Sequence, residues 1–533
     1  MKRFLLTLLL IIGIYSSLNA HKADKYYWIE FTDKENTNFN LSNPSIFLSQ
    51  KAIDRRQKQN IPLDITDLPI NNLYIQKIKS YGVNVKNTIK WLNGIIVTTT
   101  DETIIEEISF EPFVKNIIKY SIEKSVKKNK FEKSYDNTNS ENYPSLIHNG
   151  QLIHEKGYTG KDVTITIIDA GFYKVDKLPA FESAIKENRI IATYDFVRNK
   201  TDVYSEDTHG MQVLSLIAAN KPDILRGSAP DANFVLLRSE DKFTETPIEE
   251  LYWVDAAEFA DSIGTDIISS SLGYSTFDNE RGNHFYNELN GKTTIISKAA
   301  ELASKKGILV VVSAGNEGND EWGYITPPAD AAGILTVGSI DKDLTISPFS
   351  SYGPTYDGRV KPDVLSIGSN VKVQNYNGTL TSSSGTSFST PTIAGLAACL
   401  WQANPNLSNT ELIKTIIESS CHYQKPGKQF GYGIPNFIRA LQTLTEVNKL
   451  DISKTFITTP NPFTNNIDIE LSEPTKIRMV TIVNINGKKI IEINYYNTEM
   501  KNIYLTNLGQ LTKGIYIVVI LTDDGILSKK LVK

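Results

Sequence analysis

Residues 381–396 read TSSSGTSFSTPTIAGL, a polar, glycine-bearing loop that runs into an apolar helix. Ser387 stands at the junction, and Pro391 is expected in the first helical turn, where a missing N–H costs little. A hydroxyl at a helix N-terminus lies beside unpaired N–H groups and the positive end of the helix dipole. These groups suit a nucleophile whose attack creates an oxyanion. An N-cap serine in a Ser/Thr-rich loop is the alternative interpretation.

A serine hydroxyl becomes a strong nucleophile when a neighbouring imidazole takes its proton. Of the six histidines, His209 is best placed, in EDTHGMQVLSLIAAN, where a capped start leads into an amphipathic helix. An imidazole at the start of a buried helix is held in place and can face a cleft. The other five are expected to be surface or hydrogen-bonded core side chains: His21, His148, His154, His284 and His422.

Two further polar residues follow apolar, β-branched runs, which are typical of strands covered on both faces. Asp169 follows VTITII, residues 163–168, and Asn316 follows ILVVVSAG. Open α/β sheets place functional groups at the carboxyl ends of such strands. Asp169 is therefore a candidate to orient an imidazole, and the amide of Asn316 can donate a hydrogen bond to an oxyanion. Each residue alone also fits an ordinary turn.

The region around these residues alternates between strands and helices. Strand-like runs include ANFVLLRSE, DIISSSL and ILTVGSI, and helical runs include EELYWVDAAEFADSIG and IISKAAELASKKG. Such alternation predicts a parallel sheet with helices on both faces. The expected fold class is α/β for a central domain over residues 146–446. A small α+β domain precedes it, and a small β-sandwich follows it.

The segments DAGF, THGMQV, SAGNEG and GTSFSTP occur in the order Asp, His, Asn, Ser. Together they resemble the subtilisin-like serine peptidases (subtilases), whose triad follows the order Asp, His, Ser. The resemblance covers roughly residues 146–444. It implies that Asp169 orients His209, that His209 acts as general base and then acid, and that Ser387 attacks. It also implies an oxyanion hole made by Asn316 and the Ser387 N–H.

Two segments depart from the usual subtilase pattern. Met211 and Gln212 follow the His-Gly pair, and residues 361–368 read KPDVLSIG. Neither change removes a catalytic atom, so both bear on substrate preference and leave the expected reaction unchanged. The resemblance also implies a substrate groove between two walls of small residues, where an extended peptide pairs its backbone. The six expected groove residues are Ser271, Leu272, Gly273, Ser313, Ala314 and Gly315.

The N-terminal part of the chain divides into three segments. Residues 1–20 have a basic start, an apolar run and the ending SSLNA, which predicts a secretory signal peptide. Residues 21–122 read as a small α+β unit whose position resembles the subtilase pro-domain, an intramolecular inhibitor and folding aid. An independent binding module is the alternative. Residues 123–145 are polar, charged and poor in apolar residues, which favours a linker and processing zone.

Residues 455–533 consist of alternating strands with turn pairs at 486–487 (NG) and 524–525 (DG), which predicts the small β-sandwich. The PNPF start, the NINGK hairpin and the GIYIVVI…KKLVK ending resemble the C-terminal sorting domain of type IX bacterial secretion. That resemblance implies the secretion machinery as a partner. A carbohydrate- or protein-binding β-domain is the alternative.

Composition excludes some classes of partner. The formal net charge of −4 offers no basic surface for nucleic acid, and no membrane span is expected in the mature chain. The sequence does not decide whether its two cysteines, Cys399 and Cys421, form a disulfide bridge. The expected chemistry requires no cofactor. Structural calcium is a family expectation, with Asp320, Asp330 and Asp363 as candidate ligands.

The sequence thus predicts an exported serine endopeptidase, secreted or at the cell surface, made as a self-processing zymogen and acting on polypeptides. A catalytically inactive subtilase that binds peptides is one alternative, and the intact set of four site residues argues against it. An α/β-hydrolase esterase is the other. That fold expects G-x-S-x-G and an acid after the serine, whereas this chain has GTSFS and its candidate acid comes first.

Overall fold

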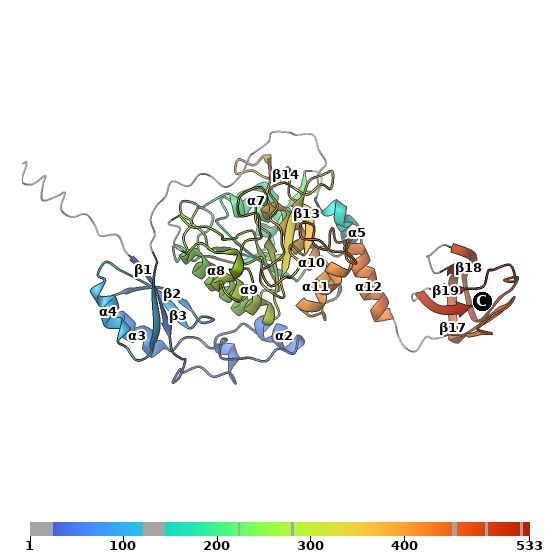
Figure 1. Cartoon of the computed structure of the whole chain (residues 1–533), viewed down its shortest axis with the longest axis horizontal. Coiled ribbons are helices and arrows are strands. Elements are labelled where there is room, and N and C mark those ends of the chain that lie inside the picture. The colour runs from blue at the N-terminus through green and yellow to red at the C-terminus, as the bar shows by residue number, and fades with distance from the viewer. Residues whose placement is uncertain are drawn as a thin grey trace, which may run out of the picture. The chain divides into compact units, whose positions relative to one another are not determined.

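The computed structural model describes residues 25–120, 144–221, 224–278, 282–449, 456–484, 489–522 and 526–533. Contacts divide the chain into two compact units, Met1–Ile438 and Arg439–Lys533. Figure 1 follows the chain from blue at its N-terminus to red at its C-terminus. The predicted signal peptide and nearly all of the predicted linker lie outside the described residues.

Four antiparallel strands in the order β2-β3-β1-β4 form the sheet of the N-terminal domain. Its main elements are β1 (Lys25–Phe31), α3 (Asn72–Ser80), β2 (Asn84–Ile89), β3 (Gly94–Thr99), α4 (Thr103–Ser109) and β4 (Val114–Tyr120). Alternate residues of β1 face opposite sides of the sheet, as the two-residue period of a strand requires. Tyr27 and Ile29 share an apolar core with α3 and α4, whereas Trp28 belongs to the core of the central domain.

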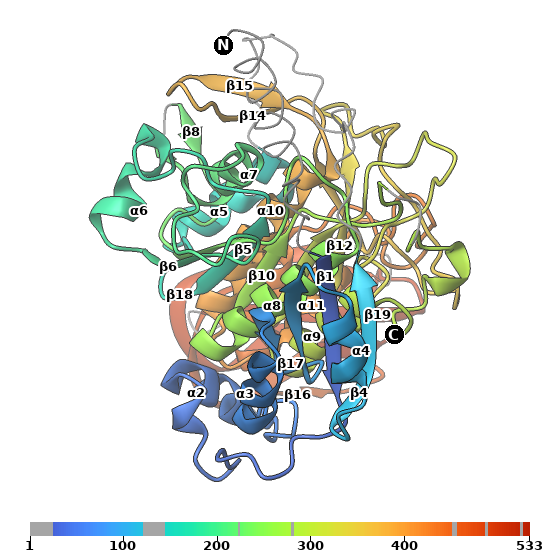
Figure 2. The same cartoon turned by 90° about the vertical axis from the view of Figure 1, so that its left-hand side faces the viewer.

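A segment between β1 and α3 leaves this sheet. It contains the short helix η1 (Pro44–Ile46) and α2 (Gln50–Lys58), and Figure 2 shows α2 set apart from β1 and β4. The Ser49 hydroxyl caps α2 by accepting a hydrogen bond from Ala52 N at 3.2 Å. Polar side chains of α2 bond to the central domain, so this segment is a second attachment of the N-terminal domain.

The central domain is built on a seven-stranded sheet in the order β13-β12-β11-β10-β5-β9-β6. All of its neighbouring strands are parallel. The strands are β5 (Thr164–Asp169), β6 (Ile190–Asp195), β9 (Asn233–Arg238), β10 (Ile267–Ser270), β11 (Leu309–Ser313), β12 (Leu335–Ile340) and β13 (Val364–Ile367). The predicted α/β fold class is confirmed. The order reverses around β5, so a crevice opens at the carboxyl ends of β5 and β10.

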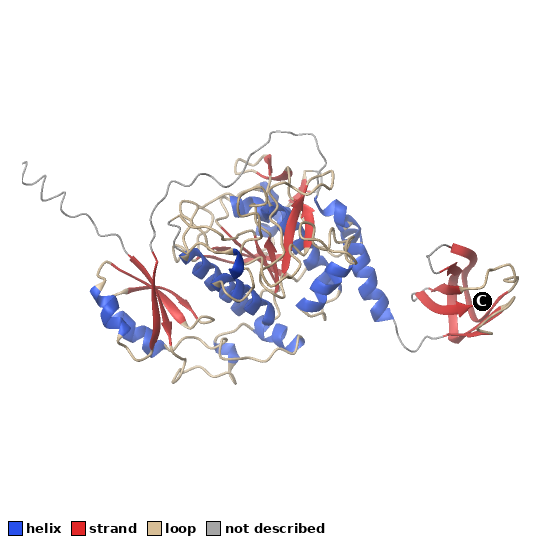
Figure 3. Ribbon diagram, in the orientation of Figure 1, coloured by secondary structure: helices blue, strands red, loops and turns tan. Residues whose placement is uncertain are grey.

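Helices cover both faces of this sheet, as Figure 3 shows in blue against the red strands. Ile168 and Ile268 lie in one core with α8 and α9, and the same core contains Trp28 of the N-terminal sheet. The N-terminal domain therefore packs on α8 and α9, while α7 and α10 contact each other on the opposite side. The helices of this domain are α5 (Gly150–Glu155), α6 (Glu182–Lys186), α7 (His209–Ala218), α8 (Ile248–Ile263), α9 (Ile295–Lys305), α10 (Thr386–Ala403) and α11 (Asn409–Glu418), with the short η2 (Pro144–His148), η3 (Pro179–Phe181) and η4 (Tyr286–Glu288).

Two small hairpins and one long helix complete the described elements outside the C-terminal strands. The hairpins pair β7 (Asn220–Lys221) with β8 (Leu225–Arg226) and β14 (Val371–Gln374) with β15 (Leu380–Ser383). Helix α12 (Phe437–Lys449) follows the central domain. No helix among the described residues combines the length and apolar character that a membrane crossing needs.

The C-terminal domain is a five-stranded antiparallel sheet that encloses its own apolar core. Its strands are β16 (Phe456–Thr459), β17 (Ile467–Asn484), β18 (Lys489–Leu505), β19 (Ile515–Thr522) and β20 (Ile526–Val532). The register breaks between Glu470 and Thr475 of β17, so the first half of this long strand pairs with β16 and the second half with β19. The predicted turn pairs at 486–487 and 524–525 lie outside the described residues.

Candidate active site

Asp169 is the last residue of β5 and is fully buried. Its Oδ1 accepts hydrogen bonds from His209 Nδ1 at 2.7 Å and from Ala170 N at 2.8 Å. The close approach of α7 depends on Gly210, because a Cβ there would stand 2.5 Å from Gly171 O and 2.9 Å from Asp169 Cβ. A side chain at this position would push the imidazole away from the carboxylate.

His209 is the first residue of α7, and its backbone N–H donates to Asp207 Oδ1 at 2.8 Å. The imidazole is 4% exposed and lies against the ring of Phe388, with 5.7 Å between ring centroids. Because the carboxylate of Asp169 accepts from Nδ1, the proton of the neutral ring resides on Nδ1 and the lone pair on Nε2. Nε2 is therefore the atom able to take a proton.

Ser387 lies in the first turn of α10, next to Phe388. Its hydroxyl donates to the carbonyl oxygen of Ser271 at 3.2 Å, so transfer of its proton to the imidazole requires it to leave this bond. Catalytic hydrogen bonds are often long or misdirected when no substrate is bound. The structure thus brings the acid, the imidazole and the alcohol to one end of the sheet from three separate elements.

The position of Pro391 differs from the sequence expectation. The helix begins at Thr386, so Pro391 is its sixth residue and lies beyond the first turn. Since proline has no N–H, the Ser387 carbonyl four residues earlier loses its helical donor. The Ser271 hydroxyl replaces that donor and bonds to the Ser387 oxygen at 2.9 Å. The proline therefore links the nucleophile's backbone to the end of β10.

Asn316 follows β11, and its Oδ1 accepts hydrogen bonds from Thr386 N at 2.8 Å and Thr386 Oγ1 at 3.0 Å. These two bonds fix the orientation of the amide, because Oδ1 is the acceptor and Nδ2 the donor. Asn316 and Ser387 line the same groove. The first N–H groups of a helix have no partner within the helix, so the Ser387 N–H and Asn316 Nδ2 can both donate to one oxyanion.

The groove beside Ser387 has a volume of about 120 Å³. Five of the six predicted groove residues line it: Ser271, Leu272, Gly273, Ser313 and Gly315. Ala314 does not, because its side chain is buried in the core and its backbone is already paired with Val337 O and Thr326 N. Five further residues line the groove: Glu240, Glu245, Glu317, Asp320 and Thr326. Of these the sequence pointed only to Asp320, and as a candidate calcium ligand.

The other histidines that the structure describes have structural partners. His148 is fully buried between Pro435 O and Ser366 Oγ, each 2.9 Å away, and burial lowers the pKa of His148 to about 4. His284 bonds to Glu250 Oε1 at 3.0 Å.

The carboxylates of Asp330 and Asp363, which the sequence offered as calcium ligands, have protein donors. Asp330 accepts a hydrogen bond from Ser297 Oγ, and Asp363 accepts one from Lys361 Nζ. Within the described ranges no three His, Cys, Asp or Glu side chains could hold a metal, and structural calcium stays an expectation drawn from the family.

Three family models match the chain. The subtilase family (peptidase S8) matches residues 160–433, the peptidase S8 propeptide domain of Bacteroidota matches 26–138, and the secretion system C-terminal sorting domain matches 459–533. The predicted resemblances to a subtilase, its propeptide and a sorting domain are confirmed.

Among curated proteins, serine protease AprX of Bacillus subtilis (strain 168) is 31% identical over 306 residues, which cover 52% of this chain and 64% of that protein. Subtilisin E of the same organism is 25% identical over 369 residues, covering 68% and 85%. The crystal structure of the epidermin leader peptide processing serine protease from Staphylococcus aureus shares the fold, with a TM-score of 0.55 at 19% identity over 79% of this chain and 99% of that chain.

Proposed function

The chain belongs to the subtilase family of serine endopeptidases, and on this premise we propose that it cleaves peptide bonds with a triad of Asp169, His209 and Ser387 through a covalent acyl-enzyme. The observation that supports this most directly is the 2.7 Å hydrogen bond from His209 Nδ1 to Asp169 Oδ1, made beside the start of α10. A buried carboxylate in this position orients the imidazole and stabilises its protonated form.

Each group has one role in the proposed reaction. Ser387 Oγ attacks the scissile carbonyl carbon while His209 Nε2 takes the hydroxyl proton, and the carbonyl oxygen becomes an oxyanion. The imidazolium then protonates the leaving amine, and the acyl group stays on Ser387. Water, deprotonated by the same imidazole, releases the acid product. No cofactor takes part in any of these steps.

The oxyanion is stabilised by the Ser387 N–H and Asn316 Nδ2 in this proposal. Thr386 holds the amide through Oδ1, so Nδ2 reaches the groove without reorganisation when charge develops. Loss of the equivalent donor in subtilisin, itself a subtilase, costs about 2.7–4 kcal/mol of barrier. Asn316→Leu should therefore lower kcat about 10²- to 10³-fold and leave KM nearly unchanged.

The chain is made with a propeptide and a sorting domain, and we extend the proposal to a self-processing zymogen. Residues 21–122 act as the intramolecular inhibitor, residues 123–145 contain the processing sites, and residues 146–446 form the protease. The sorting domain at 455–533 addresses the protein to the secretion machinery, and thus to the medium or the cell surface. Residues 1–20 supply the export signal.

A comparison of two serine variants on one helix tests the assignment. Ser387→Ala should lower casein hydrolysis roughly a millionfold, the loss known for the nucleophile in subtilisin. Mass spectrometry should find that the variant chain is not processed. Ser389→Ala is the matched control, because the Ser389 hydroxyl donates to Thr386 O inside α10. Phenylmethylsulfonyl fluoride should inactivate the parent protein and the control alike.

Three outcomes would contradict the proposal. Undiminished casein hydrolysis by Ser387→Ala would remove Ser387 as the nucleophile. Peptide binding without cleavage by the parent would favour an inactive subtilase, and hydrolysis of esters without cleavage of peptides would favour an esterase.

A further inference from the structure

The groove beside Ser387 is lined by a buried hydroxyl, that of Thr326. Thr326 lies between the two glycines of the groove walls: a Cβ on Gly273 would collide with Thr326 Oγ1, and a Cβ on Gly315 would stand 2.8 Å from the same atom. Thr326 is 2% exposed, and its Oγ1 has no hydrogen-bond partner among the described residues. An unpaired buried hydroxyl costs about 1–3 kcal/mol, so the groove favours a ligand that brings a polar group to Thr326.

Four carboxylate side chains also line this groove. Glu317 and Asp320 come from the loop after Asn316, and Glu240 and Glu245 come from the loop after β9. None of the lining residues, all of which are described, is basic. A groove whose charged side chains are all negative and whose walls have a low dielectric constant concentrates cations.

The loop that bears two of these carboxylates has a defined backbone. Glu317 N donates to Ser351 Oγ at 3.0 Å, and Glu317 O accepts from Asp320 N at 2.9 Å and from Gly323 N at 3.1 Å. These bonds fix the backbone that bears both carboxylates directly after Asn316. A cation bound in the groove with Ser387 and Thr326 therefore shares it with these charges.

The chain itself contains a segment of matching charge. The sequence SIEKSVKKNKFEK directly follows β4 and precedes the central domain. Its cations are Lys124, Lys127, Lys128, Lys130 and Lys133. This lysine-rich stretch lies within the segment expected to be processed, so the first substrate of the groove would be cationic.

We propose that the groove selects a lysine or arginine side chain on the acyl side of the scissile bond. The side chain enters the groove beside Ser387, its terminal N–H groups donate to Thr326 Oγ1 next to Gly273 and Gly315, and Glu317 and Asp320 offset its charge. This specificity rests on the proposed peptidase function and adds the class of substrate to it. A site with a buried polar group discriminates strongly against a side chain that leaves that group unpaired.

Peptides that differ only at this one residue test the proposal with the processed, full-activity enzyme. Matched substrates carry Lys, Met or Phe before the scissile bond, and kcat/KM is measured for each. We expect Lys to exceed Met at least tenfold, and the excess to shrink as salt rises because the groove charges are partly exposed. Glu317→Gln should lower kcat/KM for Lys about 3- to 10-fold more than it lowers kcat/KM for Met.

Two variants separate the groove charges from general effects. Glu321→Gln removes an exposed carboxylate next to Asp320 that does not line the groove, and it should leave the Lys-to-Met ratio unchanged. Thr326→Val replaces the hydroxyl by a methyl group of similar size and should lower the ratio. Mass spectrometry of the processed protein should find new termini after one of the five lysines.

The outcomes distinguish the two proposals. If the parent cleaves Phe or Met peptides as fast as Lys peptides, and Glu317→Gln leaves the ratio unchanged, the specificity is refuted while the peptidase function stands. If the parent cleaves no peptide and no casein, the proposed function itself fails. Equal losses for Lys and Met peptides in Glu317→Gln would show a structural role and would also overturn the specificity.

Discussion

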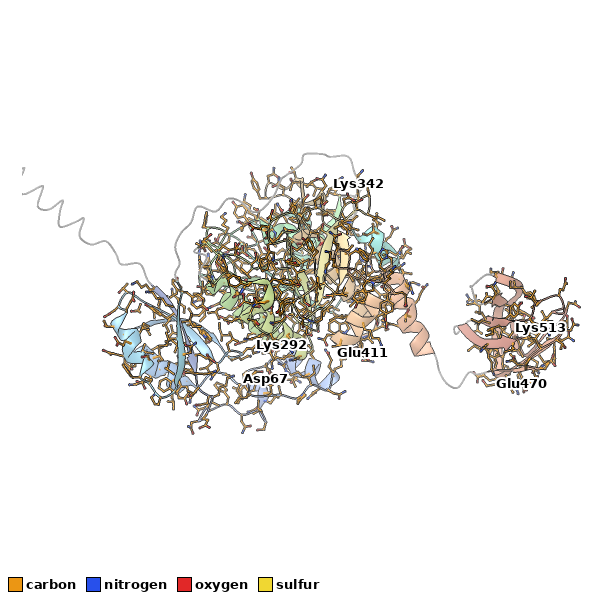
Figure 4. All side chains as sticks on the ribbon, viewed as in Figure 1. Asp67, Lys292, Lys342, Glu411, Glu470 and Lys513 are labelled. Carbon is orange, nitrogen blue, oxygen red and sulfur yellow. The ribbon has the colours of Figure 1, made fainter. Side chains whose placement is uncertain are left out.

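A buried cluster of charges joins helix α2 of the N-terminal domain to the central domain, and its disruption should loosen the propeptide measurably. Arg55 and Arg56 of α2 both bond to the carboxylate of Asp261 in α8, Arg56 at 2.8 Å. Arg56 also bonds to Asp67 at 2.7 Å, and Lys306 bonds to Asp67 at 2.9 Å. Asp67, labelled in Figure 4, comes from the loop between α2 and α3.

The expected cost of removing Arg55 follows from burial. The side chains of Arg55 and Asp261 are 3% and 0% exposed. Removing one partner of such a buried pair costs about 3–5 kcal/mol, and the lower end applies here because Arg56 still bonds to Asp261. Arg55 also donates to the backbone oxygens of Lys306 and Thr265, which lose their partner. At 1.4 kcal/mol per tenfold, Arg55→Ala should raise the equilibrium constant for opening of α2 by about two orders of magnitude.

Hydrogen–deuterium exchange of the peptide that contains α2 measures this opening directly. The measurement uses the full-length Ser387→Ala chain, which we expect to stay uncut. Lys51→Ala is the matched control from the same helix: Lys51 bonds to Asp266 at 2.6 Å, but its side chain is 41% exposed. Screening by solvent limits that pair to about 1 kcal/mol, or at most about fivefold in exchange.

The reasoning would be refuted if Arg55→Ala and Lys51→Ala accelerated exchange to the same small extent. That result would mean that α2 is held by its apolar contacts and that the buried ions contribute no net attachment. Acceleration confined to α2 in Arg55→Ala, with unchanged exchange in the C-terminal domain, is the expected outcome.

Two further predictions concern pH and thiol chemistry. Asn87 and Trp91 of the N-terminal domain bond to Asp255 and Glu258 of α8, and burial raises the pKa of both carboxyls. A carboxyl whose pKa is higher in the complex of propeptide and protease than in the separated protease stabilises that complex. This contribution is complete below the free pKa, near 4, and is lost as pH rises through the raised pKa. Propeptide retention, followed by gel filtration of the processed protein, should therefore weaken from pH 4 toward neutrality, and stronger retention at neutral pH would contradict this. Both cysteines are free; Cys399 is buried and Cys421 exposed, and burial raises the pKa of the Cys399 thiol. Ellman's reagent should thus titrate one thiol in the native protein and two after denaturation, while a count of zero in the native protein would indicate a bridge.

Local patterns in the sequence were sufficient for the inner strands of the central sheet. β5, β10 and β11 are buried on both faces, and a strand in that environment needs a continuous apolar run that is visible without a structure. The edge strand β6 was not recognised, because its half-exposed residues IIATYD need no such run. β13 was missed for another reason, since its four residues are too few to show a period.

The residue types at strand ends and helix starts, including Asp169, His209, Asn316 and Ser387, follow from this local reading of the sequence. Their partners do not. The bonds between Ser271 and Ser387 join residues 116 positions apart, and the sequence shows neither them nor the place of Thr326 between two glycines. Periodicity records how deeply a residue is buried, whereas the order of the strands decides which distant residues it meets. The chain by itself therefore determined the kind of sheet and the groups at its edge, and only the tertiary structure decided which of those groups share hydrogen bonds and a groove.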